Sequence, residues 1–202
     1  IAFFFFFFMV ALFVSGTFTQ VNSITDSLKN TVGWSLQVIS IILAILVSII
    51  IFGGIKSISK VAESVVPFMD IIYIIATVTI LLSHADNILP SLGLIFQSAF
   101  TGKAATGGFA GATMVTTIQA GIARGIFSNE SGLGSAPIAA AAAKTNEPVE
   151  QGLVSMTGTF IDTIIICSLT GLAIIVTGGW SSDLNGAMLT QSAFSSVFGN
   201  FG

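Results

Sequence analysis

Long apolar stretches alternate with short polar ones along this chain. A spanning α-helix needs about 20 mostly apolar residues, because a rise of ~1.5 Å per residue must cover ~30 Å of hydrocarbon. Stretches close to this length predict about five transmembrane helices, over residues 1–18, 36–55, 65–82, 112–143 and 152–178. The pattern therefore predicts an all-α integral membrane protein, with one transmembrane domain over residues 1–202 that is incomplete at both ends.

The composition supports the same class. Hydrophobic residues make up 53% of the chain and charged residues only 7%, whereas soluble domains carry roughly 25% charged residues. The protein is therefore expected to have membrane lipid as its solvent. Its net charge of −3 gives no electrostatic basis for binding nucleic acid. The single cysteine, Cys167, lies in an apolar stretch, so no disulfide can form within one chain.

The lysines between the predicted spans indicate an orientation. Lys56, Lys60 and Lys144 fall on one side of the membrane, and Lys29 and Lys103 fall on the other. The excess of positive charge in cytoplasmic loops then places the first three in the cytoplasm. Two shorter segments, residues 91–100 and 186–198, predict helices on the outer side. They are interpreted as lids, re-entrant pieces or ordinary connecting helices.

The fourth predicted span is interrupted near residues 127–132. Glycines, Pro137, Arg124 and Glu130 lie within an otherwise apolar helix. Unpaired backbone groups in hydrocarbon cost several kcal/mol each, so a break must be enclosed by protein or face a water-filled cavity. Transporters build their binding sites at such breaks. The alternative is a kinked helix that packs closely through small residues, since Gly121 and Gly125 have the required spacing.

The two halves of a broken helix suit a zwitterion. Free amide groups at the start of the second half, near Ser131 or Gly132, would attract a carboxylate. Free carbonyl groups at the end of the first half would accept an ammonium group or a cation. Arg124 and Glu130 are expected to form a buried structural pair or a gate. Asp162 is expected to pair with Arg124, to help bind a cation, or to bond neighbouring hydroxyl groups, in that order of preference.

The interrupted span and the segments that follow it resemble a known protein family. Residues 123–139, 151–153 and 158–163 resemble the alanine or glycine:cation symporter family, also described as sodium:alanine symporters, and the similarity extends over nearly the whole chain. The resemblance implies the inverted-repeat fold shared with the leucine transporter. The chain would cover about the third to seventh helices of that fold. The broken span would be the sixth helix, and the helix over residues 186–198 would be an outer lid.

The resemblance also implies a function. It implies sodium-coupled symport of alanine or glycine across the plasma membrane by alternating access, without enzymatic chemistry and without a cofactor other than sodium as coupling ion. The substrate-binding residues implied are Thr17, Phe18, Gln20, Phe127, Ser128, Asn129 and Gly132. Ser128, Asn129 and Asp162 are the candidate sodium ligands within this chain, whereas the sodium site most often shared across the fold would lie on helices outside it. The family usually has an Asn-Met pair before a glutamine in its third helix, and the departure at Thr17 and Phe18 leaves the preferred side chain open.

Two other classes of protein are alternatives to a transporter. A channel or pore subunit could use the broken helix as a re-entrant element. An intramembrane enzyme would need a nucleophile and a base, for which Ser128 and His84 are the candidates. These two residues lie on different spans, and no acid completes a triad. Coupling to protons in place of sodium also stays open from the sequence.

Overall fold

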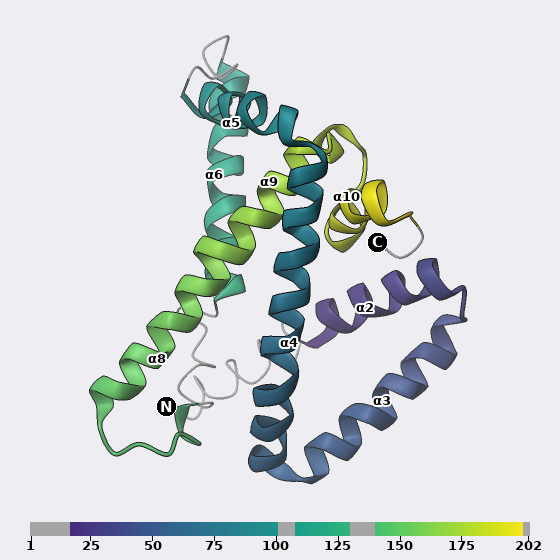
Figure 1. Ribbon diagram of the computed structural model, residues 1–202, viewed down its shortest axis with the longest axis vertical. Coiled ribbons are helices and arrows are strands. Elements are labelled where there is room, and N and C mark those ends of the chain that lie inside the picture. The colour runs from purple at the N-terminus through teal and green to yellow at the C-terminus, as the bar shows by residue number, and fades with distance from the viewer. Residues whose placement is uncertain (1–16, 101–107, 130–139, 200–202) are drawn as a thin grey trace. The chain divides into compact units, whose positions relative to one another are not determined.

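The computed structural model describes residues 17–100, 108–129 and 140–199, and every regular element within them is a helix (Figure 1). The predicted all-α class is therefore confirmed for this part of the chain. Most of the predicted first span lies outside the described residues. So do two of the candidate site residues, Glu130 and Gly132.

The chain divides into two compact units. We call residues 1–64 with 178–202 the terminal unit, and residues 65–177 the central unit. The terminal unit contains α2 (Thr17–Val32), α3 (Leu36–Phe52), η3 (Gly179–Ser181) and α10 (Ala187–Phe198). The central unit contains α5 (Ala85–Phe100), α6 (Gly108–Ser128), α8 (Pro148–Phe160), η2 (Ile161–Cys167) and α9 (Ser168–Val176). Helix α4 (Gly54–Ser83) begins in the terminal unit and continues into the central one.

In the terminal unit, α2 packs against both α3 and α10. The connection from α3 to α4 is a single residue, Gly53. The chain turns there because Gly54 adopts a φ of +69°, which a residue with a side chain rarely adopts. A Cβ atom added to Gly53 would lie 2.4 Å from Cβ of Ser57, so this position also has no room for a side chain.

Helix α4 begins at Gly54, whereas the apolar pattern predicted a span from residue 65. Lys56 and Lys60 therefore lie in exposed helical turns and not in a loop. The reason is that hydropathy marks only the apolar part of a helix, and lysine, serine and glutamate are all compatible with helical backbone. At the other end of the interrupted span, residues 141 and 142 form a turn, so the predicted helical continuation to residue 143 is shorter.

In the central unit, α8, η2 and α9 form one continuous helical rod (Figure 1). Pro148 occupies its first turn, where the missing N–H is not needed. Helix α5 packs against α9. The hydroxyl groups of Tyr73 on α4 and Thr170 on α9 share a hydrogen bond of 2.5 Å. The buried side chains of this unit include Thr77, Ile80 and Val176.

Apolar side chains cover much of the exposed helix surface, for example Ile49 and Phe52 on α3 and Phe68 on α4. Water would not favour so continuous an apolar surface. Within the described ranges, two helical stretches are long and apolar enough to cross a membrane, Gly54–Ser83 and Pro148–Val176. Helix α3 is apolar but has 17 residues. The full set of about five spans stays a prediction.

Hydroxyl groups on the two long helical stretches are mostly satisfied within their own helix. Thr79 donates to the carbonyl of Ile75, Thr157 to that of Leu153, and Thr177 to that of Ala173. This arrangement suits an apolar environment, because these hydroxyl groups donate their hydrogen bonds without water.

Candidate functional site

Helix α6 ends at Ser128, inside the region where the sequence predicted an interruption. The last helical contact is made by the backbone N–H of Asn129, which donates to the carbonyl of Gly125 at 3.4 Å. The carbonyl groups of the final turn of a helix lack intrahelical N–H partners. The end of α6 therefore presents backbone oxygens together with the side chains of Ser128 and Asn129.

These two side chains cross to the helical element η2. Oγ of Ser128 donates a hydrogen bond to Oδ2 of Asp162 at 2.6 Å. Nδ2 of Asn129 donates to Oγ1 of Thr163 at 3.1 Å. Ser128, the last residue of α6, and Asn129, which follows it, thus pair with two consecutive residues of η2. We call these four residues the α6–η2 cluster.

Element η2 is a π-helix of seven residues, and the sequence analysis did not predict it. A π-helix is rare, and π-bulges occur often at functional sites. Its hydrogen bonds join residues five apart, so residues with that spacing come to lie close to one another. Asp162 and Cys167 have this spacing, and both contact Ser128. The thiol of Cys167 lies 3.6 Å from Oγ of Ser128.

The α6–η2 cluster contrasts with several other hydroxyl groups of the α8–α9 rod. Thr157 and Thr159 donate to carbonyl groups of their own helix, although Thr170 also meets Tyr73 on α4. Asp162 and Thr163 instead reach a second helix. Helix packing alone does not require a carboxylate at this depth, so the cluster is a candidate for binding a ligand.

The donor atoms of the cluster suit a hard cation. One carboxylate, two hydroxyl groups and one amide can all offer oxygen, the ligand that such ions prefer. The single carboxylate matches a monovalent charge. Within the described part of the chain, no three histidine, cysteine, aspartate or glutamate side chains gather in a group. The cluster therefore fits sodium in its chemistry.

The other predicted site residues lie as follows. Arg124 is exposed on α6, and within the described ranges Asp162 pairs with a hydroxyl group and not with this arginine. Phe127 belongs to the last turn of α6. Thr17, Phe18 and Gln20 lie in the first turn and a half of α2, in the terminal unit. Their place in a binding site, and the Arg124–Glu130 pair, stay predictions.

Sequence reasoning missed two residues of this region, Thr163 and Cys167. Thr163 follows Asp162 directly, and a search for hydroxyl groups beside the intramembrane carboxylate would have found it. The sequence does not indicate a contact between Cys167 and Ser128, because only the wider turn of the π-helix brings the two residues together.

Long apolar helices, together with a polar cluster at the end of α6, are typical of a membrane transport protein. Its particular family follows from the sequence. The chain matches the sodium:alanine symporter family over residues 1–202, and it belongs to that family.

Several relatives agree with this membership. An uncharacterized transporter of Haemophilus influenzae is 50% identical over 192 residues, which are 95% of this chain and 42% of that protein. The sodium/alanine symporter AgcS of Methanococcus maripaludis is 46% identical over 196 residues, again 95% of this chain and 42% of that protein. The probable sodium/glutamine symporter GlnT of Bacillus subtilis is 38% identical over 183 residues, covering 90% of this chain and 37% of that protein. The chain thus spans about two-fifths of the length of these relatives.

Family membership decides several points. The resemblance drawn from residues 123–139 is confirmed, and the protein is a membrane protein of a transporter family. The family is not one of enzymes, so the hypothesis of a Ser128 nucleophile with a His84 base is set aside. Sodium is the coupling ion that the family implies.

Proposed function

We propose that this protein carries a small neutral amino acid, alanine or glycine, into the cell together with sodium, by alternating access across the plasma membrane. The α6–η2 cluster is the observation that carries the proposal. It joins the end of α6 to a carboxylate and a hydroxyl group on a neighbouring helix.

The cluster is proposed as a sodium site, with Ser128, Asn129 and Asp162 as ligands and Thr163 as a further one. Ser128 uses its hydrogen on Asp162, so the lone pairs of its oxygen can face a cation. Asn129 uses an amide hydrogen on Thr163, which orients its side-chain carbonyl. Sodium would neutralise the carboxylate and hold α6 and η2 in one arrangement. Its departure would free them to separate.

The amino acid is proposed to bind where the two half-helices face each other, at Phe127, Ser128, Asn129 and Gly132. Its carboxylate would meet the amide groups that begin the second half. Thr17, Phe18 and Gln20 would border its side chain and so set its size. The pair of Arg124 and Glu130 would act as a gate. GlnT is named as a glutamine symporter, so glutamine is the competing substrate to test.

The remaining architecture follows the family. We place the chain in a leucine-transporter-type inverted-repeat fold with several spans, and we assign α10 as an outer lid. Lys56, Lys60 and Lys144 would face the cytoplasm. One sodium ion moving down 100 mV releases about 2.3 kcal/mol. A tenfold sodium gradient adds about 1.4 kcal/mol. Together these could sustain a gradient of several hundred-fold in a neutral substrate.

The test is uptake of labelled alanine, glycine and glutamine into proteoliposomes that contain the full-length protein. An inward sodium gradient should drive accumulation, and choline in its place should not. Asn129→Ala should strongly lower the sodium-driven uptake. Uptake that is equal in choline would remove sodium coupling and point to protons or exchange. Flux that neither saturates nor accumulates would point to a channel.

A further inference from the structure

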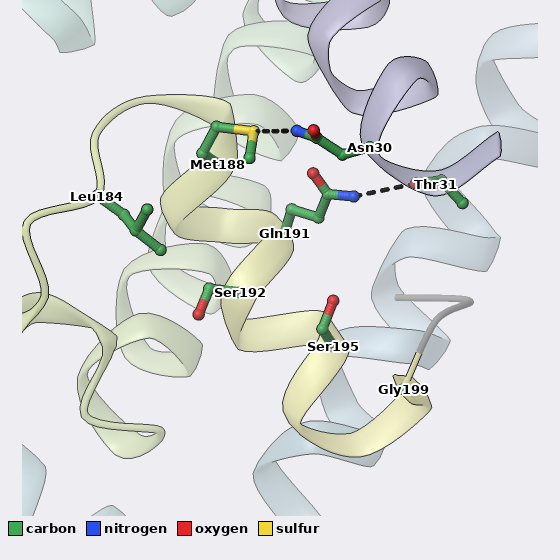
Figure 2. A pocket seen from close by; sticks show the side chains of 8 residues that line it. All are labelled: Asn30, Thr31, Leu184, Met188, Gln191, Ser192, Ser195 and Gly199. Carbon is green, nitrogen blue, oxygen red and sulfur yellow. Dashed lines mark hydrogen bonds between the residues drawn. The ribbon is translucent and has the colours of Figure 1, made fainter. Parts of the chain in front are cut away.

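A polar pocket, separate from the α6–η2 cluster, lies in the terminal unit between the end of α2 and helix α10 (Figure 2). Its volume is about 470 Å³, within the range of roughly 300–1,000 Å³ that small-molecule sites occupy. Its polar lining comes from Asn30, Thr31, Gln191, Ser192 and Ser195. None of these residues belongs to the proposed sodium or amino-acid site, although three of them lie on α10, the proposed outer lid. Both elements belong to the same compact unit.

Gln191 is the central side chain of this pocket. Its Nε2 atom donates to Oγ1 of Thr31 at 3.0 Å, which fixes the amide across the gap between α10 and α2 (Figure 2). Its Oε1 atom is buried and has no hydrogen-bond partner within the described ranges. A buried acceptor without a donor keeps its desolvation penalty, and such atoms are few in native proteins. A ligand that donates an N–H or O–H to this oxygen would remove that penalty.

Asn30 offers a second adaptable group. Its Nδ2 atom donates to the thioether sulfur of Met188 at 3.2 Å (Figure 2). A thioether is a weak acceptor, so little is lost when the amide turns to a better one. The pocket is therefore lined by one hydrogen-bond donor that can change its partner, the amide of Asn30, and by one acceptor without a partner, Oε1 of Gln191.

The lining also restricts the charge of the ligand. None of the residues that line the pocket is charged, so an ion would lose its hydration without gaining an opposite charge. Leu184 and Met188 add apolar surface that can cover a short carbon skeleton. From these observations we propose that the pocket binds a small uncharged molecule that carries a carboxamide or hydroxyl group and donates it to Oε1 of Gln191.

Lactamide is a suitable probe, because it has one hydroxyl group and one primary carboxamide and no charge. Its binding to the full-length protein in detergent would be measured by saturation-transfer NMR, with alanine present in excess to occupy the transport site. We expect saturable binding that weakens at least tenfold in Gln191→Met, which keeps the length of the side chain and removes its amide. Gln119→Met is the matched control, because Gln119 is an exposed glutamine on α6 that does not line the pocket. It should bind lactamide as the unmodified protein does.

A second variant tests the role of Asn30. Met188→Leu removes the sulfur acceptor while it keeps the apolar volume, so lactamide should bind at least as tightly. Weaker binding would show that the sulfur, and not the released amide, meets the ligand, and would overturn this part of the proposal. Absence of saturable binding, or equal affinity in Gln191→Met, would overturn the whole.

The outcome does not depend on the proposed transport function. Gln191 lies on α10, the proposed outer lid, but in neither of the proposed binding sites, so lactamide binding is measured separately from alanine uptake. Gln191→Met should keep a single elution peak in size-exclusion chromatography. A protein that transports alanine but binds no lactamide would refute only this pocket. A protein that binds lactamide but transports no amino acid would refute only the proposed function.

Discussion

Ser128 on α6 donates a hydrogen bond of 2.6 Å to the carboxylate of Asp162 on η2, which lies 34 residues further along the chain. A hydrogen bond to an ionised group is stronger than one between neutral groups. This bond joins α6 to the helical stretch Pro148–Val176, which is long and apolar enough to cross a membrane. The pair therefore holds the end of α6 against η2.

Neutralising Asp162 should weaken sodium binding. Asp162→Asn keeps the size of the side chain and an oxygen that can accept from Ser128, but it removes the charge. If Asp162 is a sodium ligand, the sodium concentration that gives half-maximal alanine uptake should rise at least tenfold, since a lost charge-assisted contact costs about 1.5–3 kcal/mol. Uptake by the full-length protein at graded sodium concentrations measures this.

Asp86→Asn, at an exposed carboxylate in the first turn of α5, is the control, and its sodium dependence should change little. An unchanged sodium dependence in Asp162→Asn would refute the site.

Asn129 and Thr163 should act together. Thr163→Val keeps the shape of the side chain and removes the oxygen that accepts from Asn129. Because each single variant breaks the same hydrogen bond, the double variant with Asn129→Ala should cost less than the sum of the two. Contacting residues typically couple by about 0.5–3 kcal/mol. Sodium-dependent alanine uptake in a double-mutant cycle gives this coupling. Additive effects would show that the bond does not matter for transport.

Some of this site could be predicted from the sequence, and the reason is chemical. Arg124, Glu130 and Asp162 are conspicuous because charged groups are costly in an apolar helix. The end of α6 at Ser128 could be anticipated from the glycines and the polar residues that follow. Hydropathy likewise located α3, which begins at Leu36, and α10, which begins at Ala187.

The pairing within the site could not be predicted in the same way. The hydrogen-bond partner of Asp162 depends on the wider turn of η2. No residue between Ile161 and Cys167 predicts a π-helix. The start of α4 was missed for another reason. The turn at Gly53 and Gly54 is a matter of backbone geometry and close packing, and hydropathy carries no information about either.

The hydrogen bond between Tyr73 and Thr170 should stabilise the central unit without taking part in transport. Tyr73→Phe removes the hydroxyl group on α4, whereas Thr170 keeps its bond to the carbonyl of Ile166. The expected loss of unfolding free energy is about 0.5–1.5 kcal/mol, the usual net value of one hydrogen bond. Thermal unfolding of the full-length protein measures it, and the KM for alanine should not change.

Thr79→Val is the matched control for that variant. Thr79 donates to the carbonyl of Ile75 in its own helix. Valine can replace it without breaking a contact between helices, so the melting temperature should change less than in Tyr73→Phe. If both variants unfold at the same temperature as the unmodified protein, the bond between α4 and α9 contributes nothing measurable.

The one-residue connection between α3 and α4 should not tolerate even a methyl group. A Cβ atom at position 53 would lie 2.4 Å from Cβ and 2.6 Å from Oγ of Ser57, far inside van der Waals contact. Ser57 belongs to the first turn of α4, so it cannot move without the backbone. Gly53→Ala should therefore lower the yield of folded protein and destabilise it by about 1–3 kcal/mol, the usual cost of overpacking. Gly93→Ala on α5 is the control, because nothing lies within 4 Å of the added methyl group. There alanine should be neutral or stabilising, as in most helix interiors. Equal melting temperatures and yields for the two variants would mean that the connection can open, and that α3 and α4 are not held at the angle this turn sets.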